Sequence, residues 1–406
     1  MTTGVYNSNF FPQDLARKSF ASMITRLMPN GTAPLFGLTS MLQDETAVQT
    51  EHGFFAKTML FPQLQVTAAG QLSTDTTWTV VSTVNLLPGM LMQVDSTKEI
   101  ILINSIISAT QVTVARGMGT VAAAAVGASI FAYQVGNAFE EASTRPAPQS
   151  IIPVRITNYT QIFRNSWAAS GTVQATQVIA GDTTPAENRQ DCAAFHAADI
   201  EKGIFFGQKL LSSRNGQPYR QMDGLINIVG NLTYYPPSYS VANVFTAGAT
   251  TNFTQLQGFF DPMFNQTTDP KTANERVLFV GGGARLVLNE IGRLNGTYFI
   301  TQGETSWGLR FSTFNLARGT LKMIEHPLFN TNASWRKMAV AVDLTTFRLA
   351  YLGGRKTMNQ EYGTSGTPVD NGIDAVGGTL TTELTTVVKN PPANAVVYNL
   401  TAAAVG

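Results

Sequence analysis

The most constraining feature of the sequence is a long amphipathic stretch from Thr184 to Ser213. It opens with Thr184-Pro185-Ala186-Glu187, a capping box with proline at the first helical position. Small and apolar residues then recur every three or four positions, which places them on one stripe of a helix. They are Ala193, Ala197, Ile200, Ile204, Gly207 and Leu211. A helix over residues 185–213 would be roughly 40 Å long, so it is predicted to be the spine of the fold.

The composition predicts a surface with unusually few charged residues. Charged residues make up 13% of the 406 residues, about half of what soluble proteins usually contain. A free monomer relies on surface charge for solubility, so this surface suits a protein that is covered by copies of itself. The net charge of +1 provides no bulk basic field for nucleic acid. No secretory signal is predicted, and the most apolar run, residues 121–133, is too short to span a bilayer.

A strand-rich block is predicted from Leu64 to Gly136. Short apolar or alternating runs separated by turn residues indicate strands; they are Thr77–Val81, Met90–Val94, Glu99–Asn104, Gln111–Ala115 and Ser129–Tyr133. Strands at this spacing are typical of a small barrel or sandwich. The flanks Glu51–Pro62 and Asn137–Gln149 resemble two sides of one long excursion. The block is therefore predicted to be a barrel inserted into a hairpin loop.

Residues 1–50 are predicted to form an extended arm rather than a domain. They contain one amphipathic set, Ala16, Phe20, Met23 and Leu27, before a turn at residues 29–31. A lone short helix is not stable in water, so its apolar side must dock on another surface. Two surfaces stay open at this point: the core of the same chain, and a neighbouring subunit.

The chain after Gly216 is expected to mix helices and strands, following strand and turn over residues 151–176. The predicted strands are Leu225–Val229, Glu275–Val280, Gly308–Phe314, Gly319–Glu325, Met338–Val342 and Phe347–Leu352. The predicted helices are Phe253–Phe264 and Ala284–Leu294. The segments Leu380–Lys389 and Ala395–Leu400 are expected to close the chain as a strand pair.

No group of residues predicts an active site, a metal site or a cofactor. The run Gly281-Gly282-Gly283 lacks the Lys and Ser or Thr of a phosphate loop, so a tight turn is predicted. Cys192 and His196 share a helix face, where we expect a buried thiol and an interface or surface histidine. A solvated helix face is expected for Asp199, Glu201 and Lys202.

Three groups of residues resemble motifs of the major capsid proteins of tailed bacteriophages, which have the Hong Kong 97-type fold. The groups are Asn158–Phe163 with Ser170–Thr172, Asp199–Lys202 with Phe206–Gly207, and the tail segments Leu380–Leu384, Val388–Pro391 and Ala395–Val397. More narrowly, the pattern resembles the major head proteins of prolate-headed Salmonella-type podoviruses. Leu87–Gly89 and Val112–Gly117 resemble small β-barrel modules of phage structural proteins. The fold class implied is α+β.

The resemblance implies a division of the chain into the parts of that fold. The implied parts are an N-terminal arm (1–50), an extended loop (51–160) carrying the barrel (64–136), a peripheral domain (161–222) with the spine helix (185–213), an axial domain (223–335) and a remainder (336–406). The remainder is expected to return mainly to the peripheral domain.

The resemblance also implies a function. Members of the family assemble as hexamers and pentamers into an icosahedral or prolate shell around double-stranded DNA, which they enclose without sequence-specific binding. Implied partners are many copies of the same chain, a portal, a decoration protein and a separate scaffolding protein, the last of which prior cleavage of a scaffolding segment would replace, with no membrane. Assembly would take place in the host bacterial cytoplasm, and the protein would reside in the virion. Candidate subunit-interface residues are Phe10, Phe11, Phe20, Met23, Leu27, Phe54, Phe55, Arg145 and Arg164.

Two other classes of protein stay open as alternatives. A hydrolase or other enzyme with a β-rich accessory domain would need a convergent set of polar residues, which the sequence does not show. A phage tail tube or decoration protein would be mostly all-β, and the long predicted helix counts against it.

Overall fold

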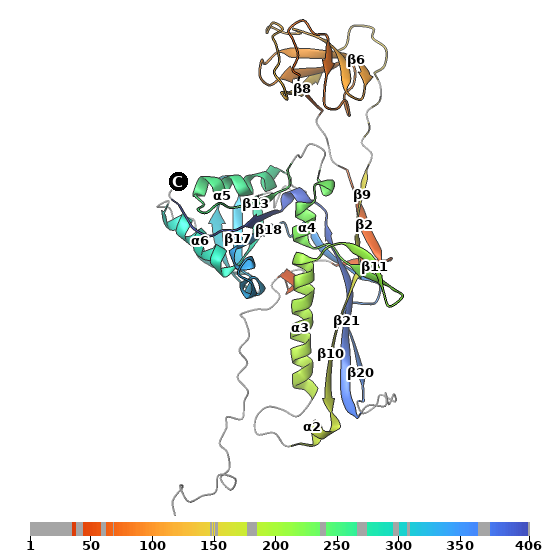
Figure 1. Ribbon diagram of the computed structural model, residues 1–406, viewed down its shortest axis with the longest axis vertical. Helices are drawn as coiled ribbons and strands as arrows, with labels where there is room; N and C mark the ends of the chain where they lie inside the picture. Colours follow the sequence, from red (N-terminus) through yellow and green to blue (C-terminus); the bar gives the residue numbers. More distant parts are fainter. Residues whose placement is uncertain are drawn as a thin grey trace, which may run out of the picture. The chain divides into compact units, whose positions relative to one another are not determined.

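The structure is a computed structural model (Figure 1). It describes residues 35–37, 44–57, 62–67, 69–146, 148, 150, 153–176, 185–235, 241–265, 274–294, 300–306, 309–363 and 374–404. The chain forms two compact units. The first unit comprises Met1–Phe54, Ile156–Tyr235 and Ser240–Gly406, and the second comprises Phe55–Arg155 and Pro236–Tyr239.

The second unit is built on a six-stranded antiparallel sheet in the order β3-β8-β5-β6-β7-β4. Its strands are β3 (Gln63–Gln65), β4 (Thr77–Thr79), β5 (Met90–Val94), β6 (Ile100–Ser108), β7 (Gln111–Ala115) and β8 (Phe131–Asn137). A bridge between Val66 and Val80 joins the ends of β3 and β4, so the sheet closes on itself as a barrel. β5 and β7 have the predicted bounds. β8 begins two residues later than predicted because Ser129 has a φ of 60°, which a strand cannot accommodate.

A buried ion pair supports one side of the barrel. The carboxylate of Glu99 is fully buried, and Arg116 donates to it from Nε and Nη2 at 2.7 Å each. The backbone N–H of Gly117 also donates to Glu99, at 3.0 Å. The Arg116 guanidinium lies over the ring of Trp78, the largest side chain of the barrel core. The pair therefore links two strand ends to the apolar centre.

The first unit contains a five-stranded sheet that carries the long helix. Its strands are β1 (Glu45–Ala47), β10 (Gln161–Ser170), β19 (Phe347–Leu352), β20 (Met358–Tyr362) and β21 (Ala375–Val388). The helix α3 (Pro185–Phe206) runs along β10 and β21 (Figure 1), and the short helix α2 (Gly171–Ala175) follows β10. The strands β2 (Glu51–Ala56) and β9 (Val154–Tyr159) form a separate two-stranded ribbon. β2 lies within the first predicted flank, Glu51–Pro62, and its partner is β9. β9 begins at Val154, after the end of the second predicted flank, Asn137–Gln149.

The prediction that the spine helix continues to residue 213 is wrong. α3 ends at Phe206, and the chain then forms a hairpin of β11 (Leu210–Arg214) and β12 (Gln217–Gln221). Asn215 and Gly216 both have positive φ, as a two-residue hairpin turn requires. The helix ends where Gly207 lies against Gly224, whose N–H donates to the Gly207 carbonyl at 2.9 Å. A side chain at residue 207 would not fit here, because a Cβ on Gly207 would lie 2.6 Å from the carbonyl oxygen of Met222.

The predicted stripe is correct only in the second half of the helix. Ile200 and Ile204 are buried, but Ala193 is exposed and Ala197 is half-buried. Cys192 and His196, one position earlier, face the sheet instead. The first half of α3 has no large aliphatic residue, so apolar periodicity could not determine which face packs on the sheet.

The other sheet of the first unit has seven strands and is covered on both faces. The strands are, in sheet order, β13 (Val244–Thr246), β22 (Ala395–Tyr398), β18 (Ala339–Val342), β14 (Glu275–Val280), β17 (Thr320–Glu325), β16 (Leu309–Asn315) and β15 (Ile300–Ser306). The helices α5 (Phe253–Phe260) and α6 (Gly282–Leu294) pack on one face. The end of α3 and the helix α4 (Leu225–Gly230) pack on the other. Short 3-10 helices lie at Leu232–Tyr234, Asp261–Asn265, Pro327–Thr331, Trp335–Lys337 and Pro391–Ala393.

Two predictions for this part of the chain are wrong. Leu225–Val229 is helical, because Leu225, Ile228 and Val229 are buried at helical spacing after a turn at Gly224. The two closing strands do not pair with each other: β21 belongs to the five-stranded sheet and β22 to the seven-stranded sheet. Residues 336–406 supply β19, β20 and β21 to the five-stranded sheet and β18 and β22 to the seven-stranded sheet. No helix in the described part of the chain is long and apolar enough to cross a membrane.

We expect Gly207→Ala to destabilise the first unit by about 1–3 kcal/mol. A Cβ at this position would lie 2.6 Å from the carbonyl oxygen of Met222 and 3.2 Å from the amide of Gly224. Gly258→Ala in α5 is the matched control, because nothing lies within 4 Å of its Cβ position. The control should be neutral or stabilise by up to about 1 kcal/mol. Urea unfolding of both variants measures the difference; equal stabilities would contradict the close contact.

Candidate functional site: buried polar junctions and exposed assembly surfaces

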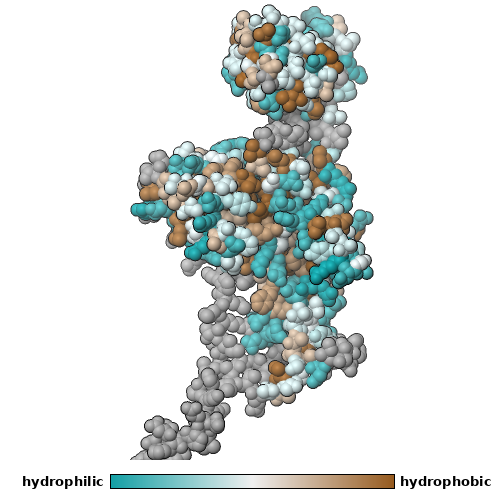
Figure 2. Space-filling model, viewed as in Figure 1, coloured by the Kyte–Doolittle hydropathy of each residue, from teal (hydrophilic) through white to brown (hydrophobic). Residues whose placement is uncertain are grey.

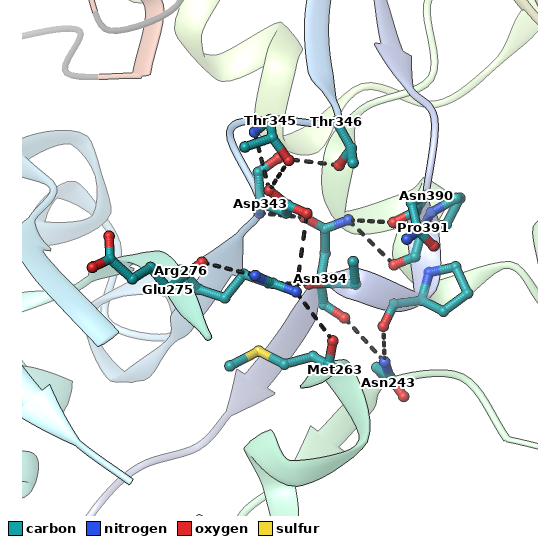
Figure 3. Close-up of polar contacts among 12 residues, drawn as sticks. Asn243, Met263, Glu275, Arg276, Asp343, Thr345, Thr346, Asn390, Pro391 and Asn394 are labelled. Atoms are coloured by element: carbon teal, nitrogen blue, oxygen red, sulfur yellow. Dashed lines mark hydrogen bonds and ion pairs between the residues drawn. The ribbon is translucent and has the colours of Figure 1, made fainter. Parts of the chain in front are cut away.

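A buried arginine lies where the two sheets of the first unit meet (Figure 3). The guanidinium of Arg276, on β14, is fully buried. Its Nε donates to the carbonyl of Ala393 at 3.0 Å, and Nη1 donates to the carbonyl of Glu275 at 2.8 Å. The carboxylate of Asp343 lies 3.9 Å away. Burial lowers the pKa of Arg276, and the charge of Asp343 opposes this shift.

Two asparagines extend this network to the turns through which the chain passes between sheets. Asn394 accepts the N–H of Asp343 at 2.8 Å and donates to the carbonyl of Asn390 at 3.0 Å. Asn243, beside β13, donates to the carbonyl of Pro392 at 2.6 Å. The turn after β18 and the turn after β21 are thereby held against β14. We call this network, comprising Asn243, Arg276, Asp343, Asn390 and Asn394, the sheet junction.

A second buried carboxylate, Glu383 on β21, joins three other segments of the first unit. Thr160 donates to its Oε1 at 2.8 Å. The guanidinium of Arg355 lies 2.8 Å from Oε2, and that of Arg220, on β12, lies 3.6 Å from Oε1. These contacts fix the start of β10, the loop after β19 and the β11–β12 hairpin relative to one sheet.

The polar residues of α3 do not lie where the sequence pattern places them. His196, expected at an interface or surface, is buried against the sheet, where its ring nitrogens lie 2.7 Å from Asn165 Oδ1 and 2.8 Å from Thr382 Oγ1. Burial lowers its pKa, and the charge of Asp199 opposes this shift. Cys192 is buried as predicted, and burial raises the pKa of its thiol.

The predicted solvated face of α3 is partly wrong. Asp199 and Lys202 are about half exposed and lie 3.7 Å apart, as expected for such a face. Glu201 is fully buried instead. Its carboxylate contacts the segment Leu35–Gly37 and His326, so long-range partners rather than local pattern decide its burial.

The glycine run after β14 forms the predicted tight turn. A Cβ on Gly281 would lie 2.4 Å from the carbonyl oxygen of Arg336. The N–H of Gly282, at the start of α6, donates to Asn330 Oδ1 at 2.7 Å. The protein therefore supplies its own acceptor at this helix start. Among the described residues, no cluster of histidine, cysteine and carboxylate side chains suits a metal ion.

The candidate interface residues lie on separate elements. Phe10, Phe11, Phe20, Met23 and Leu27 are outside the described residues. Phe55 on β2 is 72% exposed, whereas its neighbour Phe54 packs partly against Ala47, Ala350 and Val387. Arg145 is exposed in the segment after β8, and Arg164 is exposed on β10.

Further exposed apolar side chains were missed by the sequence analysis. Phe195 is 67% exposed on α3, and Val154 is 60% exposed on β9, on the same ribbon as Phe55. On the β11–β12 hairpin, Leu211 is 57% exposed and Tyr219 is 37% exposed. The Asn215-Gly216 dipeptide, which favours a two-residue hairpin turn, is a signal that could have found the hairpin.

The architecture and its surfaces together define a class of protein. The long helix on a five-stranded sheet, the second α/β sheet and the β2–β9 ribbon match the parts of the Hong Kong 97-type capsid fold, and the barrel is inserted in the sequence between β2 and β9. Exposed apolar side chains on a charge-poor surface are typical of a subunit that associates with further copies. These features place the protein in the class of structural subunits that form shells.

Comparisons with known proteins identify the family. The family model described as SU10 major capsid protein matches residues 1–401. The major capsid protein of Pseudomonas phage PaMx41 is 34% identical over 98% of this chain and 96% of its own length. The chain therefore belongs to the SU10 major capsid protein family, and its function is to form the capsid shell of a tailed bacteriophage.

Solved structures with similar architecture are more distant. A Mycobacterium phage Bobi structure aligns with a TM-score of 0.47 at 10% identity, over 95% of this chain and 96% of that one. A Mycobacterium phage Adephagia structure aligns with a TM-score of 0.45 at 8% identity, over 99% of both chains.

Proposed function

We propose that this chain assembles into hexamers and pentamers that close as the head shell around double-stranded DNA. Residues 1–50 would be the N-terminal arm, 51–160 the extended loop with its barrel, 161–222 the peripheral domain and 223–335 the axial domain. The observation that carries the proposal is the β2–β9 ribbon, whose Phe55 and Val154 side chains are largely exposed. Large apolar side chains that are exposed together on one element are typical of a surface that contacts a partner.

The proposed contacts between copies involve two kinds of surface. The ribbon with Phe54 and Phe55 would pack on a neighbouring copy, together with the exposed guanidinium groups of Arg145 and Arg164. The arm, with Phe10, Phe11, Phe20, Met23 and Leu27, would add a second contact in the finished shell. A separate scaffolding protein, a portal and a decoration protein are the further partners. The net charge of +1 supports enclosure of DNA without sequence-specific binding.

Phe55→Asp is expected to reduce the yield of shells by at least about tenfold, because an interface charge without a partner resists desolvation. The side chain is 72% exposed in the subunit, so the melting temperature of the unassembled protein should not change. Leu72→Asp on the barrel, where Leu72 is 65% exposed, is the matched control. Sedimentation measures the yield. An unchanged shell yield for Phe55→Asp, or an equal loss in both variants, would contradict the proposed contact.

A further inference from the structure

The segment Leu35–Gly37 is attached to the long helix through a buried carboxylate. Glu201 Oε1 accepts the N–H of Leu35 at 2.8 Å, and Oε2 accepts the N–H of Phe36 at 2.7 Å. Leu35 is itself fully buried in the apolar core beside Ile200 and Ile204. Hydrogen bonds to an ionised acceptor are about twice as strong as neutral ones. This end of the arm is therefore firmly held on α3.

His326 completes the attachment. Its Nε2 lies 2.8 Å from Glu201 Oε1, and its ring stacks on Phe329 with centroids 4.3 Å apart. Both His326 and Glu201 are fully buried. The backbone of Leu35 and Phe36 is thus fixed on α3 next to Glu201.

A groove lined by uncharged residues lies at the C-terminal end of α3, where Phe206 contributes to its lining. It has a volume of about 650 Å³ and lies between the end of α3, α4, β13 and β22. Its apolar lining comes from Phe206, Ile226, Leu232, Val244 and Tyr398; the remaining lining residues are Gln208, Asn227, Gly230 and Asn231. Figure 2 shows apolar side chains gathered on the surface between β13 and α4. The groove therefore suits an apolar helix side with no charge to pair.

We propose that the apolar side of residues 16–27 occupies this groove of its own chain in the unassembled subunit. That side consists of Ala16, Phe20, Met23 and Leu27. The inference goes beyond the shell contacts proposed above, because it concerns the arm before any other copy is present. The arm is then stored on its own subunit, and assembly exchanges this contact for one with a neighbour.

Chain length and attachment favour the chain's own arm over that of a second copy. Phe206 lies about 8 Å along the helix axis from Glu201. The eight residues from Leu27 to Leu35 span up to about 26 Å, so the arm reaches the groove easily. A short tether gives an effective concentration on the order of millimolar, far above that of subunits in dilute solution. The arm of the same chain therefore binds in the groove before the arm of a second copy does.

Cysteine cross-linking in the full chain tests the proposal. Leu27→Cys is combined with Leu232→Cys at the groove rim, where the leucine is 43% exposed and tolerates substitution. The native Cys192 is buried and stays in place. Mild oxidation of unassembled subunits should give an intrachain disulfide, seen as a faster-migrating monomer on non-reducing gels. The control pairs Leu27→Cys with Leu286→Cys on α6, which is 64% exposed, and should cross-link about tenfold less.

Each other outcome overturns the proposal. A disulfide-linked dimer in place of the intrachain product would assign the groove to a second copy. No cross-link, or an equal yield from the control pair, would show that residues 16–27 do not occupy the groove. A second measurement uses the single variant Leu232→Asp, in which chymotrypsin should cleave after Phe20 about tenfold faster than in the unaltered chain, because undocked segments are cleaved more readily. An unchanged cleavage rate would equally contradict the docking.

Discussion

Arg276→Met is expected to reduce the free energy of unfolding of the first unit by about 3–5 kcal/mol. The substitution removes the guanidinium from the sheet junction and leaves the carboxylate of Asp343 buried without a countercharge. It also leaves the carbonyls of Ala393 and Glu275 without their donor. An uncompensated buried charge is among the costliest single changes that a fold can undergo.

The control for this prediction is an arginine of the same unit at the surface. Arg285 pairs with Glu325 at 3.0 Å, and both side chains are 37% exposed. Arg285→Met should therefore cost less than about 1 kcal/mol. Urea unfolding followed by far-UV circular dichroism compares the two variants. Similar losses for both would mean that the sheet junction contributes no more than a surface ion pair.

Glu99→Gln is expected to destabilise the barrel by about 3–5 kcal/mol, because Arg116 would be left without its countercharge. The Arg116 side chain is only 7% exposed, so water cannot replace the carboxylate. Glutamine also places an N–H₂ group among donors from Arg116, Gly117 and Ala124. Lys98→Met, which removes an exposed pair with Asp95 at 2.8 Å, should have little effect.

The loss of stability that we expect for Glu99→Gln depends on pH. Burial alone would raise the pKa of Glu99, but hydrogen bonds from Arg116 and Gly117 outweigh burial and hold the pKa below its ordinary value. A depressed carboxyl pKa stabilises the fold above the unfolded pKa of about 4.3, and this contribution is lost as pH falls through the folded pKa. The stability gap between the unaltered chain and Glu99→Gln should therefore narrow below about pH 4. A gap that is constant from pH 7 to pH 3 would contradict this account.

The elements that were predicted correctly carry strong local signals. Strands such as Met90–Val94 and Gln111–Ala115 have short apolar or alternating runs between turn residues. α3 begins at Pro185, the first helical position that the sequence predicts. The end of α3 was missed because its stripe continues formally through Gly207 and Leu211, although the Asn215-Gly216 turn favours a hairpin.

The buried polar residues could not be predicted in the same way. Arg276 lies in an apolar strand, which marks it as unusual, but its partners come from residues 343 and 393, far along the chain. Glu201 and Lys202 are adjacent and look alike in the sequence, yet Glu201 is buried by contacts with residues 35, 36 and 326. The burial of these polar residues depends on contacts with residues far along the chain, so the periodicity of the sequence does not reveal it.

Shell formation is tested most directly by producing the full chain, alone and with a scaffolding protein, and examining the product by sedimentation and electron microscopy. The account predicts closed shells of uniform size in the presence of the scaffolding protein, built from hexamers and pentamers of this chain. Phe55→Asp should leave folded subunits that do not enter such particles. A chain that remains a small oligomer under both conditions, although correctly folded, would contradict the central claim.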